Sequence, residues 1–141
     1  MKIKMKLFKG GKLPEFKTDG AVCADAYARL EEPVVIPKGK RKLIPLGFAC
    51  ELPKGWELQV RPRSGLTAKA VDNGWGTGDW DYTGEYMACV INNTDEELKI
   101  ENGDRICQIA IREAPIIEFE VVDEIKSTVR GSGGFGSTGV K

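Results

Sequence analysis

The chain has 141 residues, in which 21 lysines and arginines balance 21 aspartates and glutamates. This length fits one domain with a substantial hydrophobic core. The zero net charge gives no global field that would attract nucleic acid or an acidic membrane, so we expect neither as a partner. Histidine is absent, which excludes histidine-based catalytic triads and histidine metal sites. Any acid–base chemistry must come from a carboxylate, tyrosine, lysine or cysteine.

The N-terminal residues and the cysteines indicate where the protein works. Apolar residues alternate with lysines over 1–7 instead of forming an apolar run, so we expect no signal peptide, and no segment reaches transmembrane length. The four cysteines, Cys23, Cys50, Cys89 and Cys107, are well separated and form no C-x-x-C pair. Three of them lie in apolar, strand-like surroundings. Small buried thiols in a reducing, cytoplasmic compartment are therefore the expected state.

Short apolar-rich segments with turn signals between them follow one another along the chain. The alternation over 1–7 predicts a strand with one buried face. Further strands are predicted at 34–36, 43–51, 56–61, 86–92, 97–100, 105–112 and 116–122. The one helical candidate is 65–71. Many short strands predict an all-β fold of the jelly-roll kind, a sandwich or barrel. We expect this domain to span 1–126 and a flexible glycine-rich tail to span 127–141.

The tail carries a selected set of side chains on a nearly unconstrained backbone. Residues 130–141 combine five glycines with one arginine, one aromatic ring and three hydroxyl groups. The Arg130 fork and the Ser and Thr hydroxyls suit phosphate oxygens, and Phe135 suits a flat base. The tail therefore reads as a lid over a nucleotide phosphate chain, or else as a disordered end. Its glycines also match parts of a dinucleotide fingerprint and a P-loop, but no helix can follow them and Ser137 replaces the P-loop lysine.

Four more clusters lie at loops or strand ends. Asp25 lies in the segment 24–28, where a lone aspartate is commonly a turn former. The segment 61–66 places an arginine and a hydroxyl before a glycine, which suits an anion or a helix cap. The glycine-rich segment 73–85 reads as a hairpin whose backbone could bind a base edge, and its Asp79 is the best candidate for a general base. The segment 102–108 is a turn that enters a strand.

In this order the five clusters resemble the five motifs of the homotrimeric dUTPases. The resemblance is carried by Ala24–Asp25, Pro62–Leu66, Gly76–Glu85, Gly103–Gln108 and Arg130–Gly139, and it spans essentially the full chain. It implies a jelly-roll homotrimer with shared active sites, and hydrolysis of dUTP to dUMP and pyrophosphate. That reaction limits uracil incorporation into DNA and supplies dUMP for thymidylate synthesis. The resemblance also implies Mg²⁺ as cofactor, positioned by Asp25 through water.

The resemblance assigns a role to each matching residue. Asp79 would activate the water that attacks the α-phosphate, and Tyr82 would lie under the deoxyribose and exclude a 2′-hydroxyl. Asn73 with the backbone at Gly76 and Gly78 would read uracil. The phosphate chain would contact Arg63, Ser64, Gly65 and Gln108. The lid, completing a neighbouring subunit's site, would add Arg130 on the γ-phosphate, Phe135 on the uracil ring, and Gly136, Ser137 and Thr138.

Two departures and two alternatives accompany this interpretation. Gly78 replaces the apolar residue that normally precedes the catalytic aspartate, and Trp75 and Trp80 are unusual neighbours that either restore the lost packing or lie on the surface. The segment between Ser64 and Asn73 is about three residues shorter than is typical of the family. The alternative functions are a dCTP deaminase of related fold, marked by ammonia release, and a non-catalytic trimeric jelly roll that binds a partner.

Overall fold

The computed structural model describes residues 1–134, which fold into short strands and one short helix. In chain order these are β1 (Lys4–Leu7), β2 (Ala24–Tyr27), β3 (Val34–Ile36), β4 (Arg41–Pro45), β5 (Phe48–Glu51), β6 (Trp56–Arg61), α1 (Ser64–Thr67), β7 (Val71–Gly74), β8 (Gly76–Gly78), β9 (Met87–Asn92), β10 (Leu98–Ile100) and β11 (Arg105–Glu113). The predicted all-β class is confirmed. No helix in this described part is long and apolar enough to cross a membrane.

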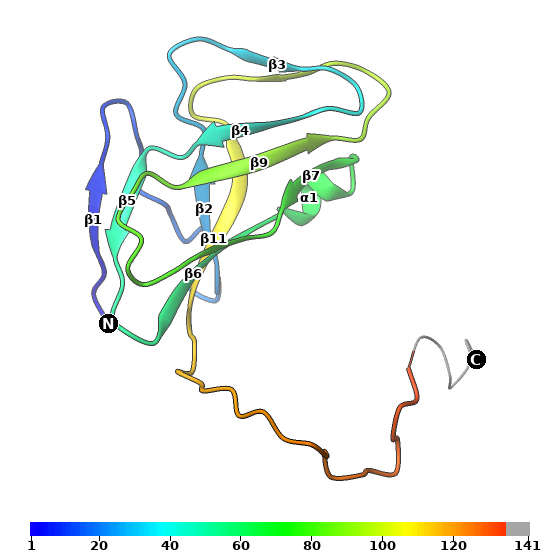
Figure 1. The fold of residues 1–141 in the computed structure, drawn as a ribbon. Coiled ribbons are helices and arrows are strands. Elements are labelled where there is room, and N and C mark those ends of the chain that lie inside the picture. Colours follow the sequence, from blue (N-terminus) through cyan, green and yellow to red (C-terminus); the bar gives the residue numbers. More distant parts are fainter. Residues whose placement is uncertain (135–141) are drawn as a thin grey trace.

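The strands pair antiparallel in four groups. The largest has the order β2-β11-β6-β8, the next β4-β9-β7, and two further pairs are β1-β5 and β10-β3. Figure 1 shows β4 and β9 across the upper part of the body and β2 and β11 running down from them. Strands close in the chain thus belong to different sheets, as the jelly-roll expectation requires.

The core lies between these sheets. Along β9 every second residue is buried, which is the signature of a strand with one face against the core. The largest fully buried apolar side chains come from β3, β4, β5, β6, β9 and β11 and their turns, and include Ile44, Leu46, Phe48, Leu58 and Val90. Each of these contributes roughly 1.5–3 kcal/mol by leaving water. The sandwich is therefore held by apolar burial, and all four cysteines are free thiols.

The strand predicted over 43–51 is two strands, because the chain turns at Gly47. Its φ of 76° lies in the left-handed region, and a Cβ there would come within 2.5 Å of the Gly11 Cα. Only glycine fits both requirements. As a result β4 pairs with β9 while β5 pairs with β1, so the two halves serve different sheets.

The helix predicted over 65–71 is shorter than expected. It spans Ser64–Thr67, and Ala70, with a φ of 59°, redirects the chain into β7. Arg63 occupies the N-cap and makes no side-chain capping bond, so the capping interpretation of this segment is wrong.

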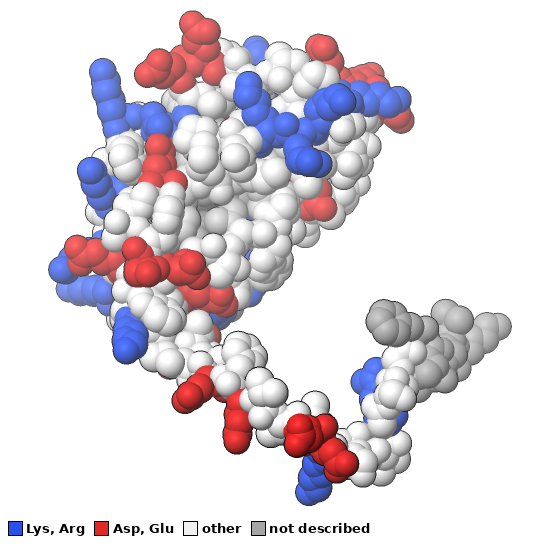
Figure 2. Space-filling model, in the orientation of Figure 1, with Lys and Arg blue, Asp and Glu red and all other residues white. Residues whose placement is uncertain are grey.

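The strand predicted over 116–122 is not formed in the described chain. After β11 the backbone leads away from the body as an extended segment, with acidic side chains along it (Figures 1 and 2). Its apolar side chains are open to solvent, with Phe119 89% and Val121 98% exposed. A strand needs a partner for its backbone groups, and residues 1–134 supply none there.

Candidate functional site

A buried carboxylate organises the first half of the site. Asp25, in β2, is only 5% exposed. Its oxygens accept hydrogen bonds from Arg105 Nη1 at 3.0 Å and Gln108 Nε2 at 3.2 Å, and Arg63 Nε lies 3.6 Å away. Arg105 and Gln108 are three positions apart on β11 and would face opposite sides of a regular strand. A register shift between Arg105 and Cys107 brings both to Asp25.

The same cluster has the character of an anion site. One carboxylate faces two guanidiniums, so the cluster carries a net positive charge, and Arg63 is fixed further by donating to the Arg105 carbonyl at 2.7 Å. Both arginines keep part of their side chains open to solvent. Guanidiniums in this state suit phosphate oxygens.

The exposed backbone at Ser64 and Gly65 borders this cluster in sequence. A Cβ on Gly65 would meet no atom within 4 Å. Nothing in the described subunit therefore requires glycine at this position. The open backbone leaves room for a ligand to approach closely.

The hairpin predicted over 73–85 is wrong in its bounds, because no strands within this segment pair with each other; the hairpin is the larger one that β7 and β9 form around it. β7 pairs with β9, and the residues between them include β8, which folds back onto β6. At its start Asn73 is 4% exposed and donates from Nδ2 to the Gly74 carbonyl at 3.0 Å. Its Oδ1 is buried and has no partner in the described chain. An unpaired buried acceptor costs about 1–3 kcal/mol, so this oxygen is suited to accept from a ligand N–H.

The glycines of β8 lie in close packing, which is tight at Gly76 and leaves no room for a side chain at Gly78. A Cβ on Gly76 would lie 3.3 Å from that of Val60, and one on Gly78 would lie 2.3 Å from the ring of Tyr86. Tyr86 therefore fills the space that Gly78 leaves, a residue that the sequence analysis did not single out. A large aromatic directly after Gly84–Glu85, in the same hairpin as a short strand with glycine at both ends, was the available signal.

Trp75 and Trp80 do not restore this packing, and the surface interpretation is confirmed. They are 62% and 38% exposed. The Arg61 guanidinium lies 5.0 Å from the centre of the Trp75 ring, in a cation–π contact.

Asp79 and Tyr82 lie on the exposed turn that follows β8. The Asp79 side chain is solvent-accessible, and the Asp79 carbonyl accepts from Tyr82 N at 3.1 Å. The Tyr82 hydroxyl donates to the Glu85 carbonyl at 2.9 Å, and its ring is 43% exposed. This turn therefore presents a free carboxylate beside an open aromatic face.

An ion pair that the sequence analysis missed anchors the end of this turn. Arg29 donates from Nε and Nη2 to the Glu85 carboxylate at 2.7 and 2.8 Å, and Gly47 N donates to it at 3.0 Å. Bidentate pairing of this kind fixes orientation as well as distance. The carboxylate thereby ties the turn to the β4–β5 connection.

The two halves of the site lie at different ends of β6 within one chain. Gln108 is opposite Arg61, whereas Gly78 is opposite Leu58. Asp79 follows Gly78 in the direction away from Arg61, so along β6 its level is about six residues, or roughly 20 Å, from that of Arg63. Within this chain the carboxylate of Asp79 is therefore not brought to the arginine cluster.

The described part of the tail, 127–134, is not brought to either half. Arg130 is exposed, donates to the Gly133 carbonyl at 2.8 Å, and lies on the segment that leads away from the body (Figure 1). The predicted site residues Phe135, Gly136, Ser137 and Thr138 lie outside the described residues.

Comparisons with known proteins identify the family and the fold of this chain. The family model described as dUTPase matches residues 10–139. The chain is 50% identical to the deoxyuridine 5′-triphosphate nucleotidohydrolase of Treponema denticola and 45% identical to that of Chlamydia pneumoniae, in each case over 99% of both chains. Its fold matches the dUTPase of Staphylococcus bacteriophage 80alpha with dUPNHPP (TM-score 0.91, 24% identity, 99% of both chains). A mutant dUTPase of phage phi11 of S. aureus, with a structural Mg(II) ion, matches with a TM-score of 0.83 at 19% identity, over 90% of this chain and 100% of that one.

Proposed function

Because this chain belongs to the dUTPase family, we propose that it hydrolyses dUTP to dUMP and pyrophosphate. The reaction would limit uracil in DNA and supply dUMP for thymidylate synthesis. One observation carries the proposal beyond family membership. The hairpin that presents the exposed Asp79 carboxylate also holds a buried, unpaired acceptor at Asn73 Oδ1. The matching ligand is a nucleotide whose nucleobase has a ring N–H: Asn73 Oδ1 would bind the nucleobase while Asp79 acts on the phosphate chain through a water.

Recognition of the nucleoside falls to the hairpin. Uracil offers one N–H between two carbonyl oxygens, so Asn73 Oδ1 would accept from it while backbone N–H groups at Gly76 and Gly78 donate to the carbonyls. Val60 packs tightly against Gly76, and Tyr86 occupies the side-chain position of Gly78. These contacts would hold the backbone at both glycines in place next to the nucleobase. The exposed ring face of Tyr82 would lie under the sugar, and a 2′-hydroxyl on the sugar would collide with it.

The arginine cluster would bind the phosphates, and Asp79 would act as the general base. Arg63 and Gln108, held by Asp25, would bind the phosphate oxygens, with Ser64 and Gly65 adding contacts from the open backbone. The Asp79 carboxylate would take a proton from the water that attacks the α-phosphate. Such a base must lie within hydrogen-bond reach of the water, which an exposed and unpaired carboxylate permits.

Mg²⁺ fits this scheme when the phosphates themselves hold it. The described residues contain no cluster of three or more acidic, Cys or His side chains able to enclose a metal. Asp25 is engaged by Arg105 and Gln108, so a water-mediated role suits it better than direct ligation. Magnesium retains several waters readily. When bound, the ion would neutralise charge on the phosphate chain.

We propose a homotrimer whose active sites combine residues of different subunits. The roughly 20 Å offset between Asp79 and Arg63 along β6 supports this, because catalysis needs the base within about 3 Å of its water. The exposed apolar segment 116–122 also supports it. An apolar groove of about 370 Å³ beside β1 and β11, lined in part by Phe16 and Trp56, would accept such a segment from a neighbour.

The division into a domain over 1–126 and a lid over 127–141 remains part of this proposal. Arg130 and Phe135 would close over a neighbouring subunit's nucleotide, since Arg130 lies away from both halves of the site in its own chain. Closure would exclude bulk water and align the attacking one. The free thiols of all four cysteines support a reducing, cytoplasmic location.

The test is a substrate panel with the purified protein and Mg²⁺. Release of pyrophosphate and ammonia is measured with dUTP, dTTP, dCTP and UTP, each alone. Pyrophosphate from dUTP only is the expected result. Ammonia from dCTP would instead identify the related deaminase. No product from any of the four, with a folded oligomer, would reject the enzyme in favour of a binding protein.

A further inference from the structure

The ring of Tyr86 occupies the side-chain position of Gly78, immediately before Asp79. A Cβ built on Gly78 would lie 2.3 Å from Tyr86 Cε1 and 2.6 Å from its hydroxyl oxygen. Both residues are buried, with Tyr86 only 4% exposed. In a close-packed interior no side chain at 78 is compatible with this ring. The backbone that delivers Asp79 therefore rests directly on Tyr86.

The same ring connects the exposed turn to the core. Tyr86 meets Tyr82 edge-on with ring centres 5.2 Å apart, and on its other side it stacks with Phe48 at 5.5 Å. Its backbone is fixed as well, because Tyr86 N donates to the Phe48 carbonyl at 3.0 Å and Leu46 N donates to the Tyr86 carbonyl at 2.9 Å. Tyr86 thus touches the beginning and the middle of the turn while the core holds it in place.

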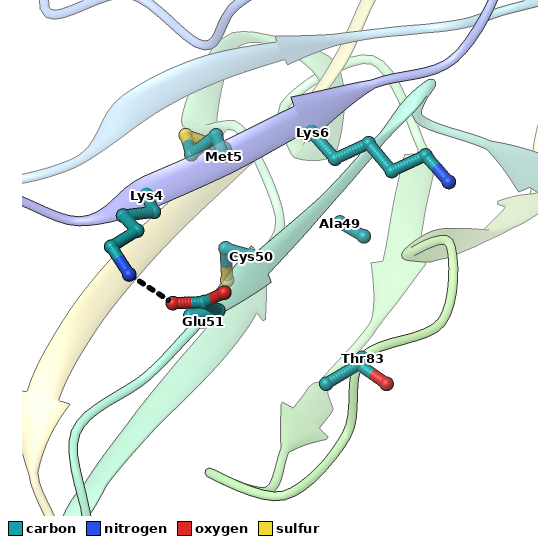
Figure 3. A pocket seen from close by; sticks show the side chains of 7 residues that line it. All are labelled: Lys4, Met5, Lys6, Ala49, Cys50, Glu51 and Thr83. Carbon is teal, nitrogen blue, oxygen red and sulfur yellow. Dashed lines mark hydrogen bonds and ion pairs between the residues drawn. The ribbon is translucent and has the colours of Figure 1, made fainter.

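The turn has little support from the neighbouring edge of the sheet. A cavity of about 260 Å³ separates Thr83 from β1 and β5, and Lys4 and Cys50 lie across it (Figure 3). Thr83 therefore does not pack against those strands. The inner, aromatic contact therefore restrains the beginning and middle of the turn, while the Arg29–Glu85 pair anchors its end.

We propose that Tyr86 is a positioning residue whose ring holds Asp79 and Tyr82 in their working geometry, and that Gly78 is glycine to admit this ring. The proposal rests on the proposed function, which makes Asp79 the base and Tyr82 the sugar contact. Tyr86 acts through these two residues. It accounts for a glycine next to the reactive carboxylate that would otherwise loosen the chain there.

The ring carries this role and the hydroxyl does not. The Tyr86 hydroxyl is buried without a hydrogen-bond partner among residues 1–134. Burial, together with the nearby Cys50 thiol, raises the pKa of Tyr86, so the hydroxyl stays protonated at working pH. Phenylalanine should therefore substitute for it, whereas an aliphatic side chain should not.

The first test compares Tyr86→Leu with the conservative Tyr86→Phe. Misplacing a reacting group by about 1 Å costs on the order of 100-fold in rate, so Tyr86→Leu should lower kcat for dUTP by about that factor. The preference for dUTP over UTP should also shrink, because Tyr82 loses its edge contact. Tyr86→Phe should keep both values within about threefold of wild type. Ile36→Ala, a core truncation in β3, is the control for lost stability without a change in kcat.

The second test moves the filling group to the other side. Gly78→Val alone should be severely impaired, because the new side chain collides with the ring. Adding Tyr86→Ala vacates that space, so the double variant should regain at least about tenfold in kcat over Gly78→Val. Relief of the clash would also restore stability, so kcat is compared at saturating dUTP on protein shown to be folded by circular dichroism. Restored folding without any recovery of kcat would contradict a role in positioning.

A third readout does not need enzyme activity. In a Trp56→Phe, Trp75→Phe background, Trp80 is the one remaining indole and lies next to Asp79. Tyr86→Leu should raise its quenching by acrylamide, while Tyr86→Phe should not. The proposal is overturned if Tyr86→Leu lowers stability like Ile36→Ala but leaves kcat, sugar preference and quenching unchanged. A wild type inert toward dUTP would reject the proposed function instead, and the quenching would still decide whether Tyr86 positions the turn.

Discussion

Replacing Glu85 by alanine tests whether the ion pair with Arg29 anchors the turn that carries Asp79. The change removes two hydrogen bonds from Arg29, at 2.7 and 2.8 Å, and leaves Gly47 N without its 3.0 Å partner. The Arg29 and Glu85 side chains are 25% and 20% exposed, so water can solvate part of the Arg29 charge once its partner is gone. Removing one partner of a fully buried pair costs about 3–5 kcal/mol, and partial exposure places this case near 3 kcal/mol.

Urea unfolding followed by circular dichroism, at one fixed chain concentration, measures this loss. Glu51→Ala is the matched control, because its pair with Lys4 is almost fully in solvent, and its unfolding midpoint should not move. A double variant with Arg29→Met should cost less than the sum of the single changes. The reasoning is refuted if Glu85→Ala is no more destabilising than Glu51→Ala, or if the two single effects simply add.

Three further predictions concern the base, the lid and alkaline stability. Asp79→Asn should lower dUTP turnover at least about 1000-fold, because the amide cannot accept the proton of the attacking water. An unreactive dUTP analogue should still bind to this variant. Near-normal turnover would reject Asp79 as the general base. Deleting residues 130–141 should abolish most activity and leave fold and oligomer intact in sedimentation, and full activity would remove the lid. Burial raises the pKa of Cys107 to about 12 from 9.0. The unfolded chain therefore loses this proton first, and this thiol should lower the free energy of unfolding by about 1.4 kcal/mol per pH unit between about pH 9 and 12. Cys107→Ala should reduce the slope by this amount, while Cys50 and Tyr86, whose pKa values burial also raises, retain part of it. An unchanged slope would contradict the prediction.

The sequence predicted those parts of the fold whose signals are local. Alternating apolar and polar residues, together with turn residues, located most strands to within a few residues. Each short strand carries its own two-residue period of apolar side chains. The break at Gly47 was missed because it depends on contact with Gly11, far away in the chain. The strand over 116–122 was predicted from composition, but pairing needs a partner strand, and the described part of the chain provides none there.

The site divides in the same way. Motif order was enough to select Asp25, Asn73 and Asp79, because their residue types and neighbours are distinctive. What surrounds them could not be predicted. The meeting of Arg105 and Gln108 on Asp25 requires an irregular register, and the contact of Tyr86 with Gly78 requires the folded hairpin. These are pairwise distances that no single stretch of sequence encodes.

Two aspartates in this chain show how environment separates roles that the side chain alone leaves open. Asp25 is buried and accepts from two donors on β11, with the Arg63 guanidinium close by, so its charge fixes the arginine cluster. Asp79 is exposed on a turn, so its oxygens remain accessible to a water and a substrate. A base needs that accessibility, but accessibility also means that packing around the carboxylate does not hold it. The geometry of Asp79 must therefore come from beneath its backbone, which is where the ring of Tyr86 lies.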